Sequence, residues 1–320
     1  GMAAPAAFHG RGWHATSVCG TFAAALAAGV CERMDRAALT AALGIAGSLA
    51  SGVMEFLEDG SWTKRFHPGW AACAGLHAAA LARAGFRAPA TILEGRFGFL
   101  AAYSDGAQAA LVAASDAPEL MRTAIKPHAC CRYMQGPIDA ALALRATSGF
   151  DPRTVERIEV GMLAPGFAIV CEPAEAKRRP TSVVDAQFSL PFGVALALVR
   201  GTTGPDDFAA DAWNDPVVRA LMDRVVALSD PALDARFPRA WPCWVRIARR
   251  DGAPLEARVD RPRGDAESFP DAGELDRKFR ALAGRALAPA ATERLAAAVD
   301  DFPRAPSARA LLAAAVPTVT

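Results

Sequence analysis

The spacing of apolar residues changes twice along the chain, and these changes constrain the fold more than any other feature. From about residue 16 to residue 104 the apolar positions recur at helical spacing. After about residue 122 they alternate, first over Val155–Met162 and then on both sides of Asp251-Gly252, a turn signal between two strands of a β-hairpin. Helical spacing returns after Pro270. The sequence therefore predicts helices, then an α+β segment, then helices again.

This order predicts a mainly α protein with a large all-α helical domain and an inserted smaller α+β domain. We expect residues 1–122 and 269–320 to form the helical domain and residues 123–268 to form the α+β domain. Within the α+β domain, a helix over residues 184–199 is expected to be interrupted at Pro191, which lacks the backbone N–H that a helix interior needs.

Several helix boundaries can also be predicted. Thr16 or Ser17 is expected to cap the first helix, and Asp35 to precede a second helix whose apolar stripe extends to Leu57. A third helix is expected over residues 69–84, with Pro68 near its first position. The segment before Pro68 would then lie at a helix entrance, where free N–H groups attract anions.

Composition excludes several classes of function. The hydrophobic fraction is 52%, driven by alanine and typical of packed helices, and the formal net charge of +1 provides no field for nucleic acid or an anionic membrane. No apolar run is long enough to span a bilayer, and the first residues carry no signal-peptide pattern. Seven cysteines at irregular spacings indicate reduced thiols. We therefore expect a cytoplasmic protein with no nucleic-acid or membrane partner.

The obvious cofactor and metal motifs fail on inspection. Gly10-Arg-Gly12-Trp-His-Ala15 has dinucleotide-motif spacing, but no strand is predicted before it and its bulky residues would crowd a pyrophosphate. Cys130-Cys131 has no C-x-x-C partner, and Glu55, Glu58 and His67 have no ligand spacing typical of zinc. The sequence thus predicts neither a metal nor an organic cofactor.

Lysine is rare in this chain, which makes each lysine informative. Of the 35 basic residues only four are lysine: Lys64, Lys126, Lys177 and Lys278. Lysine supplies a compact point charge and a titratable amine, neither of which arginine replaces well. A lysine kept in so arginine-rich a chain is a candidate for binding an anion or transferring a proton.

Titratable and cationic groups gather in four segments at predicted helix entrances and domain junctions. The segments are residues 10–16 with His14, residues 55–70 with Lys64 and His67, residues 125–133 with Lys126, Cys131 and Arg132, and residues 179–192. Each group also has an ordinary interpretation: a histidine as a cap, a lysine as solvated charge, Cys131 as a small buried apolar residue, and Arg132 as part of a structural pair.

Long strings in the same segments resemble the MmgE/PrpD family, which includes 2-methylcitrate dehydratase, cis-aconitate decarboxylase and an iminodisuccinate epimerase. The resemblance covers essentially the whole chain, through GRGWHATSVCG, ALGIAGSLASGVMEFLEDGSWTKRFHPGWAACAGLHAA, PATILEGRFGFL, IKPHACCRYMQGPIDAAL and RPTSVVDAQFSLPFGVALAL. It implies a large helical domain, a smaller α+β lid, a homodimer, and an active site in the cleft between the two domains.

The same resemblance implies site residues. It points to His14, Lys64 and Lys126 as catalytic residues, and to His67, Arg132 and Cys131 as residues that bind the substrate. Two positions depart from the decarboxylase branch: Cys131 stands where that branch has a catalytic histidine, and Phe192 stands where it has a tyrosine. The family's helical domain also begins well before the segment containing His14. A shortened chain, a separate partner chain and a homologue without activity all remain open.

The resemblance implies a lyase that removes water from a small tricarboxylate such as 2-methylcitrate without a cofactor. Lys64 and Lys126 would bind carboxylates, Arg132 would add a further anion contact, and His14 would transfer the proton. Decarboxylation or epimerisation of a related polycarboxylate passes through similar carbanionic species, so both remain alternatives. A carboxylate-binding homologue with impaired catalysis is a third.

Overall fold

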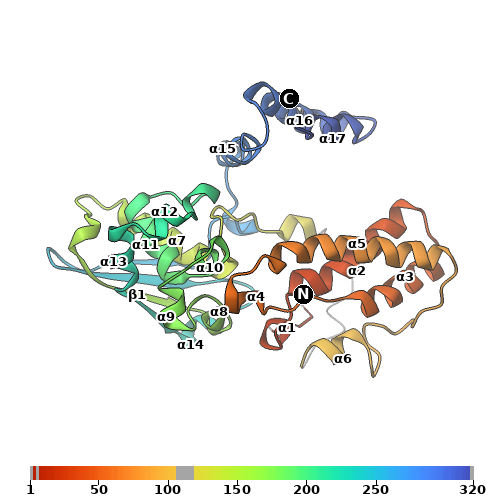
Figure 1. Ribbon diagram of the computed structural model, residues 1–320, viewed down its shortest axis with the longest axis horizontal. Coiled ribbons are helices and arrows are strands. Elements are labelled where there is room, and N and C mark those ends of the chain that lie inside the picture. Colours follow the sequence, from red (N-terminus) through yellow and green to blue (C-terminus); the bar gives the residue numbers. More distant parts are fainter. Residues whose placement is uncertain (1–2, 5–6, 106–118, 318–320) are drawn as a thin grey trace.

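The computed structural model describes residues 3–4, 7–105 and 119–317, and Figure 1 shows their arrangement. The protein is largely α-helical with one small four-stranded sheet, as the sequence predicts. In the described part of the chain, none of the helices combines the length and the apolarity needed to cross a lipid bilayer.

Three long helices, α2, α3 and α5, pack on one another and are called the helical layer below (Figure 1). The approach of α2 to α5 is close because small residues meet there. A Cβ atom added to Gly75 of α5 would lie 2.4 Å from the Ala24 Cβ and 2.6 Å from the Ala25 nitrogen of α2. The helices of this part are α1 (Ala7–Gly10), α2 (Ala15–Cys31), α3 (Arg36–Leu49), α4 (Phe56–Asp59), α5 (Thr63–Arg83) and α6 (Phe99–Tyr103).

Helix boundaries here differ in part from those predicted. The Asp35 cap is confirmed, because its carboxylate accepts a hydrogen bond from the Ala38 N–H at 2.8 Å. The predicted Thr16 or Ser17 cap is wrong: α2 begins at Ala15, after His14. Helix α3 stops at Leu49 rather than near Leu57, and the chain soon reaches Gly52, whose φ of 120° is incompatible with a right-handed helix.

The start of α5 matters most for the site. The helix begins at Thr63, so Pro68 lies inside it and not near its first position. Pro68 has no N–H to donate to the carbonyl of Lys64 four residues earlier. Lys64 and His67 therefore lie within the first turns of α5 and not in a preceding loop.

The sheet has the strand order β2-β1-β3-β4. Strand β1 (Val155–Met162) pairs in parallel with β2 (Val225–Ser229) and antiparallel with β3 (Cys243–Arg249), which pairs antiparallel with β4 (Leu255–Val259). The predicted strand over Val155–Met162 and the predicted hairpin are confirmed. Strand β2 was not predicted.

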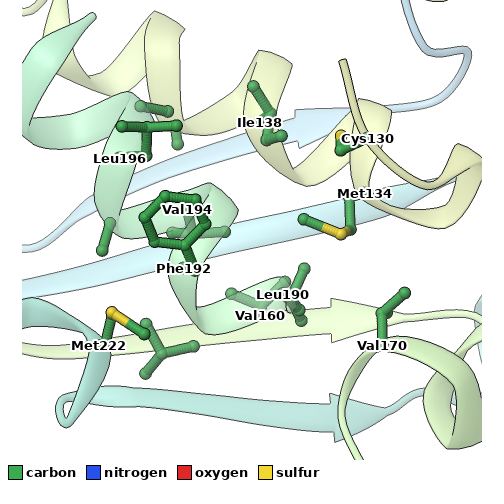
Figure 2. Close-up of a cluster of buried hydrophobic side chains, with 14 of the residues drawn as sticks. Cys130, Met134, Ile138, Val160, Val170, Leu190, Phe192, Val194, Leu196 and Met222 are labelled. Carbon is green, nitrogen blue, oxygen red and sulfur yellow. The ribbon is translucent and has the colours of Figure 1, made fainter. Parts of the chain in front are cut away.

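Helix α11 (Leu190–Arg200) packs on α7 (Gln135–Arg145) and α13 (Pro216–Met222), and α7 and α11 pack on the sheet. We call this assembly the sheet region. Figure 2 shows its core, where Phe192, Leu196 and Met222 are completely buried. The helix predicted over residues 184–199 is interrupted as expected, into α10 (Val183–Gln187) and α11 with Pro191 in its first turn. The shorter helices here are α8 (Ala164–Val170), α9 (Ala174–Lys177), α12 (Ala210–Trp213) and α14 (Pro231–Asp234).

The last three helices stand apart from both assemblies in Figure 1. They are α15 (Ala272–Ala283), α16 (Pro289–Asp301) and α17 (Arg309–Ala314). Helix α15 starts with a capping box, in which Asp271 accepts from the Glu274 N–H and Glu274 accepts from the Asp271 N–H. One face of α15 reaches the cavity described next.

Candidate functional site

A cavity of about 520 Å³ lies where α5, the segment before α7 and α15 meet, and we call it the lysine cavity. Lys64 from α5, Lys126 from the segment before α7, and Lys278 from α15 all line it. The other lining residues are Pro127, His128, Ala129, Cys130, Cys131, Gln187, Phe188, Gly204, Pro205, Ala281 and Leu282. No acidic side chain of the described ranges is among them, so the cavity is suited to an anion.

The loop from Lys126 to Cys131 is held in place by Gln135, at the start of α7. Gln135 is fully buried; its Oε1 accepts from the His128 N–H at 3.1 Å, and its Nε2 donates to the His128 carbonyl at the same distance. The Cys131 N–H donates to the Gln187 carbonyl at 2.9 Å. These bonds fix the backbone that carries the Lys126 side chain.

His128 adds a second support to this loop. Its Nε2 lies 2.9 Å from the Asp139 carboxylate of α7, and its Nδ1 lies 2.6 Å from the Thr203 hydroxyl. Because both ring nitrogens have partners, the imidazole has no free nitrogen to offer a ligand. His128 thus joins three segments of the cavity wall although it also faces the cavity.

Lys126 lies close enough to the other two cavity lysines to perturb both. Burial lowers the pKa of Lys64, and the charge of Lys126 lowers it further. Burial likewise lowers the pKa of Lys278, again with a contribution from Lys126. An anion bound among them would relieve this repulsion and stabilise the ammonium forms.

His14 and His67 form a buried pair beside the cavity. Their Nδ1 atoms lie 3.0 Å apart, so one ring donates and the other accepts. Burial lowers the pKa of His14 to about 3, aided by the charges of Lys64, His67 and other nearby bases. The pKa of His67 is lowered by burial and by Lys64. Both imidazoles are neutral at neutral pH.

An aromatic layer separates this histidine pair from the cavity. Phe56 lies against both imidazoles, with ring centroids 6.1 Å from His14 and 5.9 Å from His67. Phe56 also packs on Phe188, which lines the cavity and lies under the Lys64 ammonium at 5.4 Å. The histidine pair is therefore close to the lysines but does not line the cavity in this structure.

Cys131 lies in the cavity wall as a neutral thiol. Burial raises its pKa, while the nearby charges of Lys126, Lys64 and Lys177 act in the opposite direction. Lys177 is buried and close enough to act on Cys131. The other three lysines of the chain line the cavity.

Arg132 lies outside the lysine cavity. Its guanidinium forms an ion pair with Asp265 and stacks on Trp241, with its central carbon 5.0 Å from the ring centroid. The structure thus brings together five of the six residues singled out from the sequence and leaves Arg132 in a separate, structural contact. Phe192 is also remote from the cavity, because it is buried among Phe208 and Trp213.

Two features of the cavity are not among the site residues expected from the sequence. Lys278 is the third cavity lysine; the rarity of lysine marked it as a candidate, but the family resemblance did not assign it a role. Gln135 and Asp139 support the loop from inside α7, and a buried amide of this kind has no sequence signature. Within the described ranges, no three His, Cys, Asp or Glu side chains gather in a way that could hold a metal ion.

Comparison with known proteins shows the family of this chain. The chain belongs to the MmgE/PrpD family: the profile of the MmgE/PrpD C-terminal domain matches residues 128–303, and that of the N-terminal domain matches residues 1–112.

Two fungal proteins are among its curated relatives. A cis-aconitate decarboxylase of Aspergillus terreus is 27% identical over 291 residues, which cover 86% of this chain and 58% of that protein. The cis-aconitate decarboxylase-like protein oryM of Aspergillus oryzae is 26% identical over 293 residues, covering 87% and 59%. The chain therefore spans less than two thirds of the length of these relatives.

Proposed function

We propose that this protein is a cofactor-independent lyase that removes water from a small tricarboxylate such as 2-methylcitrate. The observation that carries the proposal is the lysine cavity, where Lys64 and Lys126 face one space with no acidic side chain of the described residues lining it. A carboxylate bound to an ammonium group forms a charge-assisted hydrogen bond, worth about 1.5–3 kcal/mol. A molecule with several carboxylates can form more than one such hydrogen bond and gains the corresponding free energy for each.

In the proposed reaction, a base takes a proton from the carbon beside a carboxylate, and the neighbouring hydroxyl accepts a proton from an ammonium group of the cavity and leaves as water. The base then releases its proton to solvent, from which the lysine is protonated again. Lys64 and Lys126 hold the carboxylates and stabilise the negative charge that develops on them. His14 takes the proton: its imidazole is neutral at neutral pH, and Phe56 and Phe188, which separate it from the cavity in this structure, move aside for it to reach the substrate. This role requires the tautomer in which His14 donates to His67 through Nδ1, leaving its Nε2 free to accept.

The remaining residues have supporting roles in this proposal. His67 orients His14 across the 3.0 Å contact, and the Cys131 thiol contacts the substrate from the cavity wall. Arg132 supports the wall through Asp265 and does not bind the anion. We further propose that residues 123–268 act as a lid over the helical part, and that the working protein is a cytoplasmic homodimer.

Decarboxylation of an unsaturated tricarboxylate is the second candidate, because the curated relatives are named cis-aconitate decarboxylase. The neutral His14 favours dehydration, since removing a proton from carbon needs a base, whereas decarboxylation needs an acid to protonate carbon after CO₂ leaves. The Cys131 thiol, whose pKa is raised, and the Lys64 ammonium, whose pKa is lowered, are groups of the wall that could fill that acid role.

Nuclear magnetic resonance of 2-methylcitrate and of cis-aconitate in D₂O tests this function. Dehydration yields an unsaturated tricarboxylate from 2-methylcitrate, and decarboxylation consumes cis-aconitate with loss of CO₂. We expect the first reaction, and we expect His14→Ala or Lys126→Ala to abolish it while His77→Ala, at an exposed position of α5, does not. Unchanged turnover in the first two variants would refute the assigned roles. Binding without turnover would refute the enzyme itself.

A further inference from the structure

The third cavity lysine belongs to a different part of the chain from the other two. Lys278 lies on α15, and Ala281 and Leu282 line the cavity beside it. Positions i, i+3 and i+4 share one face of a helix, so α15 turns a single face toward the cavity. The part of that face that lines the cavity carries one cation and is otherwise apolar.

The Lys278 ammonium is already directed toward Lys126. It donates a hydrogen bond to the backbone carbonyl of Lys126. An ammonium group has three N–H donors, so two remain for a ligand while this bond is kept. The bond also sets the position of the charge relative to the loop that carries Lys126.

Lys278 has no acidic partner among the described residues, unlike Arg280 two positions on. Arg280 pairs with Asp276 and Glu293 on the C-terminal helices, whereas no salt bridge involves Lys278. The charge of Lys126 also acts on both Lys64 and Lys278, so three cations lie close to one another around one cavity. Two carboxylates would neutralise only two of them.

We propose that Lys278 determines specificity by binding the third carboxylate of the substrate, so that the lysine cavity prefers tricarboxylates to dicarboxylates. This proposal rests on the proposed function, because it assigns a carboxylate to each of the three lysines. It gives α15 a direct part in recognition. The preference comes from one contact, and the corresponding dicarboxylate keeps the contacts to Lys64 and Lys126.

Isothermal titration calorimetry with propane-1,2,3-tricarboxylate and glutarate tests this directly, because the two acids share a five-carbon chain and differ by the central carboxylate. Wild-type protein is expected to bind the tricarboxylate at least about 10-fold more tightly, the gain typical of one charge-assisted contact. Lys278→Met is expected to weaken binding of the tricarboxylate by about 10-fold and binding of glutarate by less than about 2-fold. Lys278→Arg, which keeps the charge, is expected to recover part of the loss.

Arg277→Met is the matched control, because it removes one positive charge from the same helix at an exposed position outside the cavity. It should leave both affinities within about 2-fold of wild type, since exposed charges are screened by salt. If Lys278→Met lost the same affinity for both acids, or lost affinity for neither, the specificity role would be overturned while the proposed function would stand. Failure of wild-type protein to bind any of these acids would instead overturn the proposed function and this role with it.

Discussion

In the sheet region the buried side chains are large, whereas in the helical layer they are mostly alanine. Phe192, Leu196 and Met222 are completely buried beside the sheet. The buried cluster that joins α2, α3 and α5 contains Ile45 and five alanines. The layer also leaves large apolar residues exposed, such as Phe66 at 62% and Leu76 at 59%.

The two regions are therefore stabilised by different means. Burying a large apolar side chain contributes about 1.5–3 kcal/mol, and an alanine contributes much less because it removes less surface from water. The helical layer depends instead on close backbone approach, as at Gly75. The lysine cavity lies where the segment before α7, bonded through His128 to Gln135 and Asp139 of α7, meets residues from α5 and α15.

The largest contrast is expected between two phenylalanines. Phe192→Ala should lower the free energy of unfolding by about 3–5 kcal/mol, because it leaves a cavity in a packed core. Phe66→Ala should change it by less than about 0.5 kcal/mol, because the side chain is exposed. Denaturant unfolding measures both. A comparable loss for Phe66→Ala would mean that this face of α5 is covered in solution, and the contrast between the regions would fail.

Acid should destabilise the protein through the histidine pair next to the helical layer. The pKa of His14 is lowered to about 3, so between about pH 6.5 and pH 4.5 the unfolded chain binds a proton that the folded protein does not. Lowering the pH through this range should therefore lower the free energy of unfolding, by on the order of 2 kcal/mol for this one group.

His14→Gln should remove most of that pH dependence, as measured by denaturant unfolding at several pH values. His77→Gln, at an exposed position of α5, serves as the control and should leave the pH dependence unchanged. An unchanged slope in His14→Gln would show that His14 is not kept neutral by burial.

A smaller effect separates two glycines of α5. Gly75→Ala should lower the free energy of unfolding by about 1–3 kcal/mol, because the new methyl group meets backbone atoms of α2. Gly69→Ala should raise it by about 0.5–1 kcal/mol, because nothing lies within 4 Å and alanine favours the helix. If both substitutions raised the free energy of unfolding, the close approach of the α2 and α5 backbones would not be what stabilises the helical layer.

Local sequence patterns predicted the fold well where they were unambiguous. The alternation over Val155–Met162 and the turn signal at Asp251-Gly252 were sufficient to predict β1 and the β3-β4 hairpin, because strand spacing and turn residues indicate the same structure there. Strand β2 was missed because its five residues follow α13 directly and continue an apolar run that also fits a helix. The early start of α5 was missed because Pro68 usually marks the first turn of a helix.

The site was predictable as a set of residue types but not as a geometry. The rarity of lysine and the titratable segments indicated Lys64, Lys126 and the histidines, which the structure brings close together. The sequence could not show that Phe56 and Phe188 separate the histidines from the cavity, or that Arg132 forms an ion pair with Asp265. Such details depend on contacts between residues far apart in the chain.

Thermal unfolding with and without citrate tests most directly whether the lysine cavity binds a small polycarboxylate. At about 100 times its dissociation constant, citrate should raise the free energy of unfolding by about 2.7 kcal/mol. Sodium chloride at the same ionic strength should not. The account predicts a higher unfolding midpoint for the wild-type protein and no such rise for the double variant Lys64→Met, Lys126→Met. A midpoint that does not move in the wild-type protein, or that rises equally in both proteins, would contradict it.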